Sequence, residues 1–152
     1  MFPQLDSMKC PICREEVKPT TERGLRVYCE KCKFLIQPFD TTKIKQLKTT
    51  VNDVIKKIEK KEDFLFIDVR NPDEREIASI NGTVLIPLTE LPSQMDTLEK
   101  YKDKEIVVHC HHGGRSMTAA KFLHQSGFKN VKSMDGGIDA WSLLVDNSIE
   151  RY

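Results

Sequence analysis

The chain has 152 residues, of which 31% are charged and 39% are hydrophobic, so it can form one ordinary domain or a small domain with a mini-domain. This balance excludes an intrinsically disordered chain, and no apolar run approaches the ~20 residues of a membrane-spanning helix. A formal net charge of +1 gives no reason to expect strong binding to nucleic acid or to a membrane surface.

The charge is distributed unevenly, which indicates two different parts. Residues 1–48 hold ten Lys and Arg against six Asp and Glu, whereas residues 49–152 hold fourteen against seventeen. Residues 1–40 contain four prolines and too few apolar side chains to build a core, and segments this short need a covalent or metal staple. We therefore predict a small N-terminal domain over residues 1–40 and a larger domain over residues 41–152.

Four of the five cysteines crowd into the N-terminal part and form two C-x-x-C pairs. Cys10 and Cys13 are followed, after fifteen residues, by Cys29 and Cys32. The first residues lack the basic start and apolar stretch of a secretory signal, so we expect a cytoplasmic protein, and in that reducing compartment clustered cysteines usually bind metal. The spacing predicts a four-thiolate Zn²⁺ site with no open position, and residues 8–40 resemble the zinc-ribbon family.

Alternatives to structural zinc stay open at this point. A four-thiolate site also accepts iron, and the cysteines could instead form two disulfides or a C-x-x-C redox pair in an oxidising or catalytic setting. The default role of the ion is to replace the missing hydrophobic core. The functional alternative is a ribbon that binds a partner protein or nucleic acid, which its excess of basic residues permits.

From Val51 onward, helical and strand patterns alternate, which is typical of a parallel sheet with helices on both faces. The polar connector 40–50 has room for a short strand. The chain then reads as helix 51–58, strand 64–69, a short helix opening at 72–74, strand 84–86, helix 89–101, strand 106–110, helix 117–124, strand 131–134, and a helix around Trp141. The fold class expected is therefore α/β.

The fifth cysteine, Cys110, lies where a predicted strand ends and a helix follows. A loop that joins a buried strand to a helix N-terminus turns backbone N–H groups inward, and the helix dipole adds partial positive charge. Gly113 and Gly114 permit backbone conformations that side chains forbid, and Arg115 adds a full charge. These features favour a reactive thiolate at Cys110 over a buried structural cysteine.

Four motifs in order resemble the rhodanese (sulfurtransferase) family over residues 44–152. They are D-V-R-N-P-D-E at 68–74, I-N-G-T through I-P at 80–87, C-H-H-G-G-R-S at 110–116, and G-G-I-D-A-W at 136–141. The likeness extends to single-domain rhodaneses and to the rhodanese modules fused to adenylating enzymes. The chain departs from the pattern at Arg75, where an aromatic residue is common, and at Ala78-Ser79, where Gly-His is common.

The resemblance implies a sulfur-transfer mechanism at Cys110. The thiolate takes the outer sulfur of a small-molecule donor such as thiosulfate, holds it as a persulfide, and passes it to a thiol or a protein acceptor. The residues to which the resemblance gives a supporting role are Asp68, Arg70, His111, His112, Gly113, Gly114, Arg115 and Ser116. Of these, Arg115 binds the donor anion or braces the loop, Asp68 helps to organise the loop, and Arg70 pairs with Glu74. For His111 and His112, a direct catalytic role competes with a role as variable rim residues.

Two rival functions stay open. Related Cys-to-Arg loops hydrolyse phosphate esters or reduce arsenate, but those loops carry five residues between Cys and Arg, whereas this one carries four. The second rival is a non-enzymatic adaptor made of an inert rhodanese scaffold and a ribbon. Inert relatives typically lose the cysteine, which this chain keeps.

Overall fold

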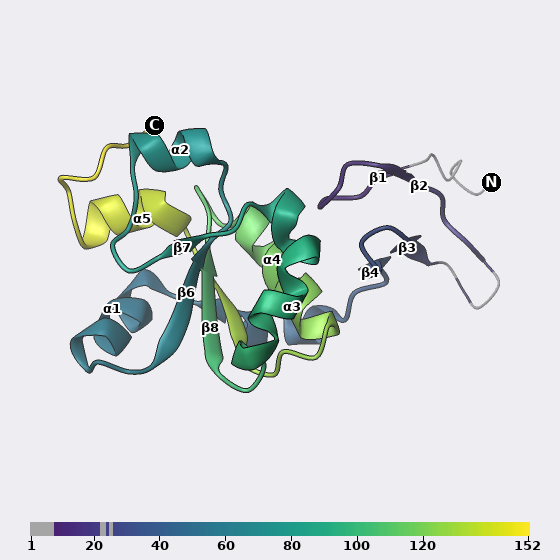
Figure 1. Ribbon diagram of the computed structural model, residues 1–152, viewed down its shortest axis with the longest axis horizontal. Coiled ribbons are helices and arrows are strands. Elements are labelled where there is room, and N and C mark those ends of the chain that lie inside the picture. The colour runs from purple at the N-terminus through teal and green to yellow at the C-terminus, as the bar shows by residue number, and fades with distance from the viewer. Residues whose placement is uncertain (1–7, 22–23, 25) are drawn as a thin grey trace. The chain divides into compact units, whose positions relative to one another are not determined.

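The computed structural model describes residues 8–21, 24 and 26–152, and the first seven residues of the predicted N-terminal domain lie outside the described residues. The chain divides into two compact units, Met1–Lys43 and Ile44–Tyr152 (Figure 1). Each unit has its own secondary structure. None of the helices in the described part of the chain has the length and apolar character needed to span a membrane.

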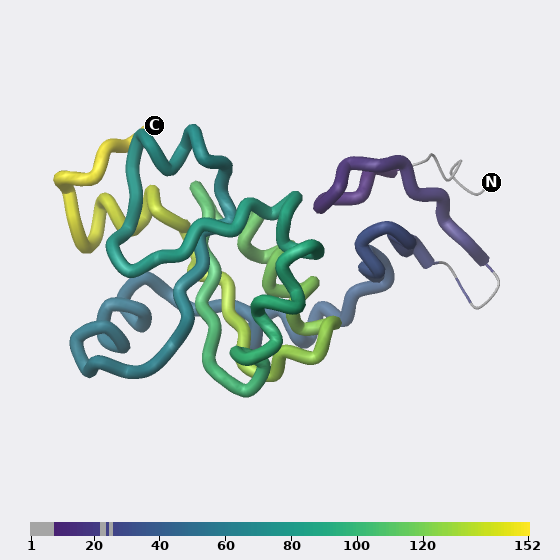
Figure 2. The backbone as a smooth tube through the Cα atoms, in the orientation of Figure 1, coloured from purple at the N-terminus to yellow at the C-terminus, as the bar shows by residue number. Residues whose placement is uncertain are grey.

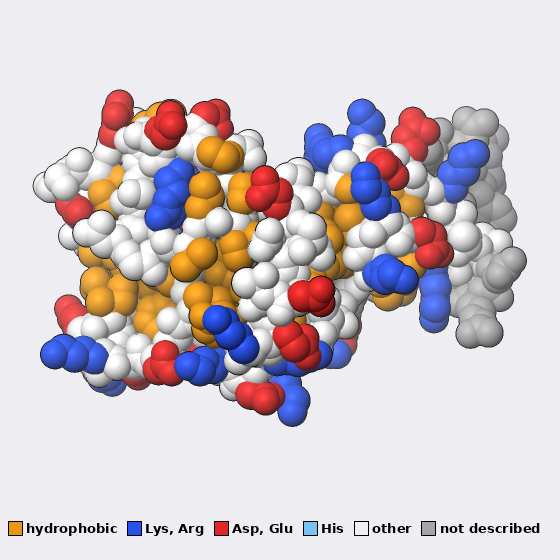
Figure 3. All heavy atoms as spheres, viewed as in Figure 1, with side chains coloured by type: hydrophobic (Ala, Val, Ile, Leu, Met, Phe, Trp, Pro, Cys, Tyr) orange, Lys and Arg blue, Asp and Glu red, His pale blue; other side chains and the backbone are white. Residues whose placement is uncertain are grey.

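The N-terminal unit consists of two short antiparallel hairpins. Strands β1 (Met8–Lys9) and β2 (Glu16–Val17) form the first, and β3 (Val27–Cys29) and β4 (Phe34–Gln37) form the second. Each C-x-x-C pair lies at the turn of one hairpin. On the face that Figure 3 shows, basic and acidic side chains of this unit are interspersed, so its excess of Lys and Arg does not make that face uniformly basic.

The second unit contains a five-stranded parallel sheet in the order β5-β9-β8-β6-β7. The central strands are β6 (Phe64–Asp68), β8 (Glu105–His109) and β9 (Val131–Met134), and the short edge strands are β5 (Lys48–Thr49) and β7 (Val84–Leu85). The predicted α/β architecture is confirmed, and β5 lies in the polar connector where a short strand was expected.

Helices cover both faces of this sheet (Figure 1). On one face lie α1 (Val51–Glu59) and α5 (Gly137–Leu144), and α4 (Gly114–Gln125) lies on the other with α3 (Met95–Leu98). A further short helix, α2 (Pro72–Ile77), follows β6. The predicted helix 89–101 is instead mostly 3-10 helix, over Leu88–Gln94 and Glu99–Tyr101, because Pro92 has no N–H to give to an α-helical turn.

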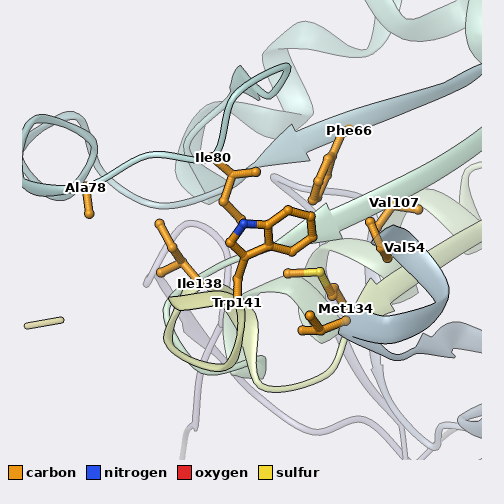
Figure 4. Close-up of a cluster of buried hydrophobic side chains, with 9 residues drawn as sticks. Val54, Phe66, Ala78, Ile80, Val107, Met134, Ile138 and Trp141 are labelled. Atoms are coloured by element: carbon orange, nitrogen blue, oxygen red, sulfur yellow. The ribbon is translucent and has the colours of Figure 1, made fainter. Parts of the chain in front are cut away.

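The core on the α1–α5 side is built around Trp141, the only tryptophan of the chain. Its indole contacts the ring of Phe66 at a centroid distance of 6.1 Å, and Figure 4 shows apolar side chains from α1, α5 and the sheet gathered around it. Residues of this cluster are Val51, Val54, Phe66, Ala78, Ile80, Val107, Met134, Ile138 and Trp141. The packing fixes α5 against the sheet, and α5 in turn contacts the loop after β8.

The strands of a parallel sheet all end at the same edge, so the residues that follow them lie close together there. Strand β6 ends at Asp68 and β8 ends at His109, directly before Cys110. The chain after α5 then returns to lie alongside α2, as the tube in Figure 2 shows. Residues far apart in the sequence therefore meet next to Cys110.

Candidate active site and cysteine cluster

Cys110 lies in the loop between β8 and α4, as the sequence predicts. Its Sγ accepts a hydrogen bond from the backbone N–H of Gly113 at 3.0 Å and donates to Ser116 Oγ at 3.4 Å. Gly113 directly precedes α4, so the sulfur lies at the positive end of that helix. The residue is only 1% exposed.

The loop owes its shape to the first turn of α5. The backbone N–H of Ile138 donates to the Cys110 carbonyl at 2.9 Å, and that of Asp139 donates to the His111 carbonyl at 3.2 Å. Across a planar trans peptide the C=O and the next N–H point in opposite directions, so the N–H groups of His111 and His112 face away from α5. The loop thus turns its carbonyls to α5 and its N–H groups to the other side.

Glycine is required at two positions of this contact. Gly137 has φ +58°, and a Cβ there would lie 2.4 Å from the carbonyl oxygens of Cys110 and His111. Gly113 has φ +124°, which side chains rarely allow. Gly114 was expected to need the same freedom, but that prediction is wrong, because Gly114 starts α4 and a Cβ there would meet nothing within 4 Å.

Arg115 is held by Glu74 of α2. Its two terminal nitrogens donate to the two carboxylate oxygens at 2.6 and 2.7 Å, a bidentate pair. These bonds, with the N–H of Asn71, hold the pKa of Glu74 at about 2, well below its ordinary value. Arg115 thus links the loop to α2 in this structure, and both of its expected roles stay predictions.

Asp68 and Arg70 form a buried ion pair at the end of β6. Arg70, which is 0% exposed, donates through Nε and Nη2 to both Asp68 oxygens, at 3.0 and 2.8 Å. Burial alone would raise the pKa of Asp68, but these bonds lower it. The predicted pairing of Arg70 with the Glu74 carboxylate is wrong, because Arg70 reaches only the Glu74 backbone carbonyl, at 3.3 Å.

Asp68 is expected to help organise the loop at Cys110, and its carboxylate has other partners besides Arg70. A second arginine, Arg75, donates to Asp68 Oδ2 at 3.3 Å, and the neutral ring of His109 lies 3.9 Å from the same oxygen. Burial lowers the pKa of His109 to about 4. Among the described residues, these partners of Asp68 lie outside the loop 111–116, at the ends of β6 and β8 and on α2, so its expected role in organising that loop stays a prediction.

The two loop histidines belong to a stack of three rings. The His111 ring stacks on Tyr152 at 4.0 Å between centroids and on His112 at 3.9 Å. Burial, and then the neighbouring His112, lower the pKa of His111, which favours its neutral form. His112 is largely exposed and lies 3.8 Å from Asp139.

Tyr152 is a site residue that no sequence pattern indicates. Its hydroxyl donates to Glu74 Oε1 at 3.0 Å and accepts from Arg70 Nη1 at 2.9 Å, while its ring covers His111. No motif contains Tyr152, and it lies 82 residues from Arg70 in the chain. Only the course of the chain after α5 brings it to this place.

The four N-terminal cysteines converge as predicted. Their sulfurs all lie within 4.8 Å of one another, with Cys10 and Cys32 at 4.0 Å and Cys13 and Cys29 at 3.6 Å. Four sulfurs about 2.3 Å from a tetrahedral Zn²⁺ are about 3.8 Å apart, so the cluster has the size of a four-thiolate metal site. A disulfide would need about 2.05 Å, and all four cysteines are free.

The two knuckles have matching backbones. In each, an N–H donates to the first sulfur at 3.4 Å, from Ile12 to Cys10 and from Cys32 to Cys29. The residue after each second cysteine has a positive φ, 67° at Arg14 and 53° at Lys33, which bends the chain around the sulfurs. Burial raises the pKa of Cys32, so a cation would be needed to keep all four thiolates charged in this place.

Comparison with known proteins agrees with this geometry. The model of the rhodanese-like domain family matches residues 50–144. The chain is 35% identical over 91 residues to the thiosulfate sulfurtransferase GlpE of Pseudoalteromonas translucida, covering 60% of this chain and 85% of that protein. It is 40% identical over 98 residues to the putative sulfurtransferase YtwF of Bacillus subtilis, covering 64% of this chain and 90% of that protein.

Solved structures agree as well. A rhodanese-related protein of Thermoplasma volcanium superposes with a TM-score of 0.55 at 35% identity, over 62% of this chain and 88% of that one. The region matched by the family model, residues 50–144, contains the loop after β8 and the strands β6, β7, β8 and β9. On the family match, these relatives and the fold, the chain belongs to the family of rhodanese-like domains.

Proposed function

We propose that the protein is a sulfurtransferase that carries sulfane sulfur on Cys110, from a donor such as thiosulfate to a thiol or protein acceptor. The observation that carries the proposal is the Cys110 sulfur at the start of α4, bonded by the Gly113 N–H. A negatively charged sulfur is stabilised at such a place by the amide and by the helix dipole. The sulfurtransferase names of the relatives support the same activity.

The reaction has two steps. In the first, the Cys110 thiolate attacks the outer sulfur of thiosulfate, the S–S bond of the donor breaks, and sulfite leaves with the electron pair, so that Cys110 carries a persulfide anion. In the second, an acceptor such as cyanide attacks the outer sulfur of the persulfide, thiocyanate leaves, and the thiolate returns. Charge balances in each step, and the alternation predicts ping-pong kinetics.

Phosphate-ester hydrolysis is the weaker candidate. A phosphatase needs a cation that closes on the phosphate oxygens, but Arg115 has both terminal nitrogens on the Glu74 carboxylate. The loop also has one residue fewer between Cys110 and Arg115 than phosphatase loops. Both features favour a single sulfur atom over a tetrahedral phosphate.

We further propose that Cys10, Cys13, Cys29 and Cys32 hold a structural Zn²⁺. When bound, the ion supplies the positive charge and the cross-link that join the two hairpins, whose own apolar core is small. Iron would fit the same ligands, and the metal content of the purified protein distinguishes the two. The four ligands leave no open position, so this site takes no part in the sulfur chemistry.

The test is to assay thiosulfate:cyanide sulfur transfer and phosphate-ester hydrolysis side by side, in wild type and in Cys110→Ser. We expect transfer that Cys110→Ser abolishes, and no hydrolysis. Hydrolysis without transfer would falsify the proposal in favour of a phosphatase. The absence of both activities, also with an organic persulfide as the donor, would favour the adaptor.

A further inference from the structure

We propose that Ser133 is a positioning residue for Cys110, one that aims the hydroxyl of Ser116 at the anionic sulfur. The inference rests on the proposed sulfur transfer only in that a Cys110 thiolate is the form that attacks the donor. Ser133 lies in none of the motifs at 68–74, 80–87, 110–116 or 136–141.

The three side chains form a buried chain of hydrogen bonds. Ser133, 2% exposed, lies on β9 between β5 and β8, and its Oγ is 2.7 Å from Ser116 Oγ. Ser116, 0% exposed, lies in the first turn of α4, with its Oγ 3.4 Å from Cys110 Sγ and 3.1 Å from the Gly113 carbonyl. Burying a polar side chain lowers the stability of the fold unless the side chain forms a hydrogen bond. Ser133 forms its bond with Ser116, the residue that contacts the Cys110 sulfur.

The hydrogens available to each group suggest one direction for these bonds when Cys110 is a thiol. A serine hydroxyl has one hydrogen and two lone pairs. The thiol donates to Ser116 Oγ, and Ser116 gives its only hydrogen to the Gly113 carbonyl. Either hydroxyl could donate in the short contact between the two serines; we assign the bond from Ser133 to Ser116, because that direction lets Ser116 keep its bond to the Gly113 carbonyl.

When Cys110 loses its proton to solvent, the arrangement changes by one rotation. The thiolate can only accept, so the Ser116 hydrogen turns from the Gly113 carbonyl to the sulfur. The carbonyl is not left without a donor, because the N–H of Met117 also reaches it, at 3.1 Å. Ser133 goes on donating to Ser116, which holds the Ser116 oxygen in place and polarises its hydrogen toward the sulfur.

Removing the Ser133 hydroxyl should therefore make the thiolate form of Cys110 less stable, although Ser133 itself does not contact the sulfur. In Ser133→Ala, we expect Cys110 to be alkylated by iodoacetamide more slowly at pH 7, by at most about fivefold, which is the factor for the complete loss of one ordinary hydrogen bond. The rate should return to the wild-type value at high pH, where the thiol is fully ionised. Peptide-resolved mass spectrometry follows Cys110 separately from the other four cysteines.

A matched pair of variants separates the effect of the hydroxyl from the effect of side-chain size. Ser133→Thr and Ser133→Val add the same bulk, but only threonine keeps the hydroxyl, so Thr should restore the wild-type pH profile and Val should resemble Ala. Ser142→Ala is the control, since Ser142 is equally buried but donates to the Asp139 carbonyl. If bulk at this position unfolds both variants, the alanine profile decides alone.

The inference is overturned if Ser133→Ala has the wild-type alkylation profile, or if Val and Thr have the same profile as each other. Because alkylation needs no sulfur donor, this outcome is independent of the proposed function. A Cys110 that reacts with iodoacetamide as expected but never takes sulfur from any donor would sink the proposed function and leave the role of Ser133 standing.

Discussion

The protein uses buried cysteines in two regions, and the contrast lies in what surrounds each sulfur. In the N-terminal cluster, the neighbours of a sulfur are other sulfurs at 3.6 and 4.0 Å. At Cys110 the neighbours are an amide N–H and a hydroxyl, at the start of a helix. Burial is similar in the two regions, so it does not decide the chemistry. Converging thiols form a cation site, whereas an N–H group and a hydroxyl at the start of a helix form a place for one anionic sulfur.

The largest effect expected from this contrast comes from changing one cysteine in each region. Cys110→Ser should abolish sulfur transfer and keep the full metal content, because serine is a far weaker nucleophile. Cys13→Ser should do the reverse, losing metal while Cys110 still accepts sulfur. Metal analysis and the thiosulfate:cyanide assay on both variants provide the check. Loss of transfer in both variants would show that the two regions are not independent.

Metal removal should unfold one region and spare the other. With a strong chelator, we expect the backbone amides of β1 to β4 to exchange with solvent freely, because the hairpins lose the ion that joins them. Amides of β6, β8 and β9 should keep their protection. Hydrogen exchange on the full chain, with and without chelator, measures both at once. Protected hairpins after complete metal loss would contradict a structural role.

The Glu74–Arg115 brace should make stability depend on pH in the acid range. The pKa of Glu74 in the folded protein is about 2, lowered by Arg115 from its usual 4.5, so the carboxylate stabilises the fold above pH 4.5 and this contribution is lost as the pH falls toward 2. Glu74→Gln should lower the free energy of unfolding at pH 7 by about 1 kcal/mol, allowing for partial exposure of Arg115.

Urea unfolding at pH 7 and at pH 3 tests this brace. The gap between wild type and Glu74→Gln should shrink at the lower pH, and the variant should transfer sulfur more slowly since the loop loses its tie to α2. A gap that stays constant between the two pH values would show that the ion pair does not stabilise the folded state.

The smallest effect is expected at Tyr152. Tyr152→Phe removes the bonds to Arg70 and Glu74 but keeps the ring on His111, so it should cost about 1 kcal/mol of stability and alter turnover only a few-fold. Tyr152→Ala also removes the stack and should alter turnover more. Tyr28, exposed to the same extent in the N-terminal unit, supplies Tyr28→Ala as the control. Equal turnover in Tyr152→Phe and Tyr152→Ala would mean that the stack has no role.

The sequence predicts this molecule well where a short stretch contains the whole signal. The two C-x-x-C pairs, the strand that ends before Cys110, and the glycine turn at Gly113 are such stretches. Contacts set by the course of the chain could not be predicted. The bond from Arg115 to Glu74 spans 41 residues, and that from Arg70 to Tyr152 spans 82. The sequence predicts a helix within 89–101 whose start Pro92 limits, and in the structure only Met95–Leu98 of this segment is α-helical.

The contrast between the four metal-site cysteines and the reactive Cys110 is tested most directly by peptide-resolved mass spectrometry of the metal-loaded protein after incubation with thiosulfate. It reports, for each of the five cysteines, whether the side chain has gained a sulfur atom. We predict the gain at Cys110 and at none of the four cluster cysteines. Sulfur on the cluster with Cys110 unmodified would contradict the account, because the reactive sulfur would then be in the region assigned to metal.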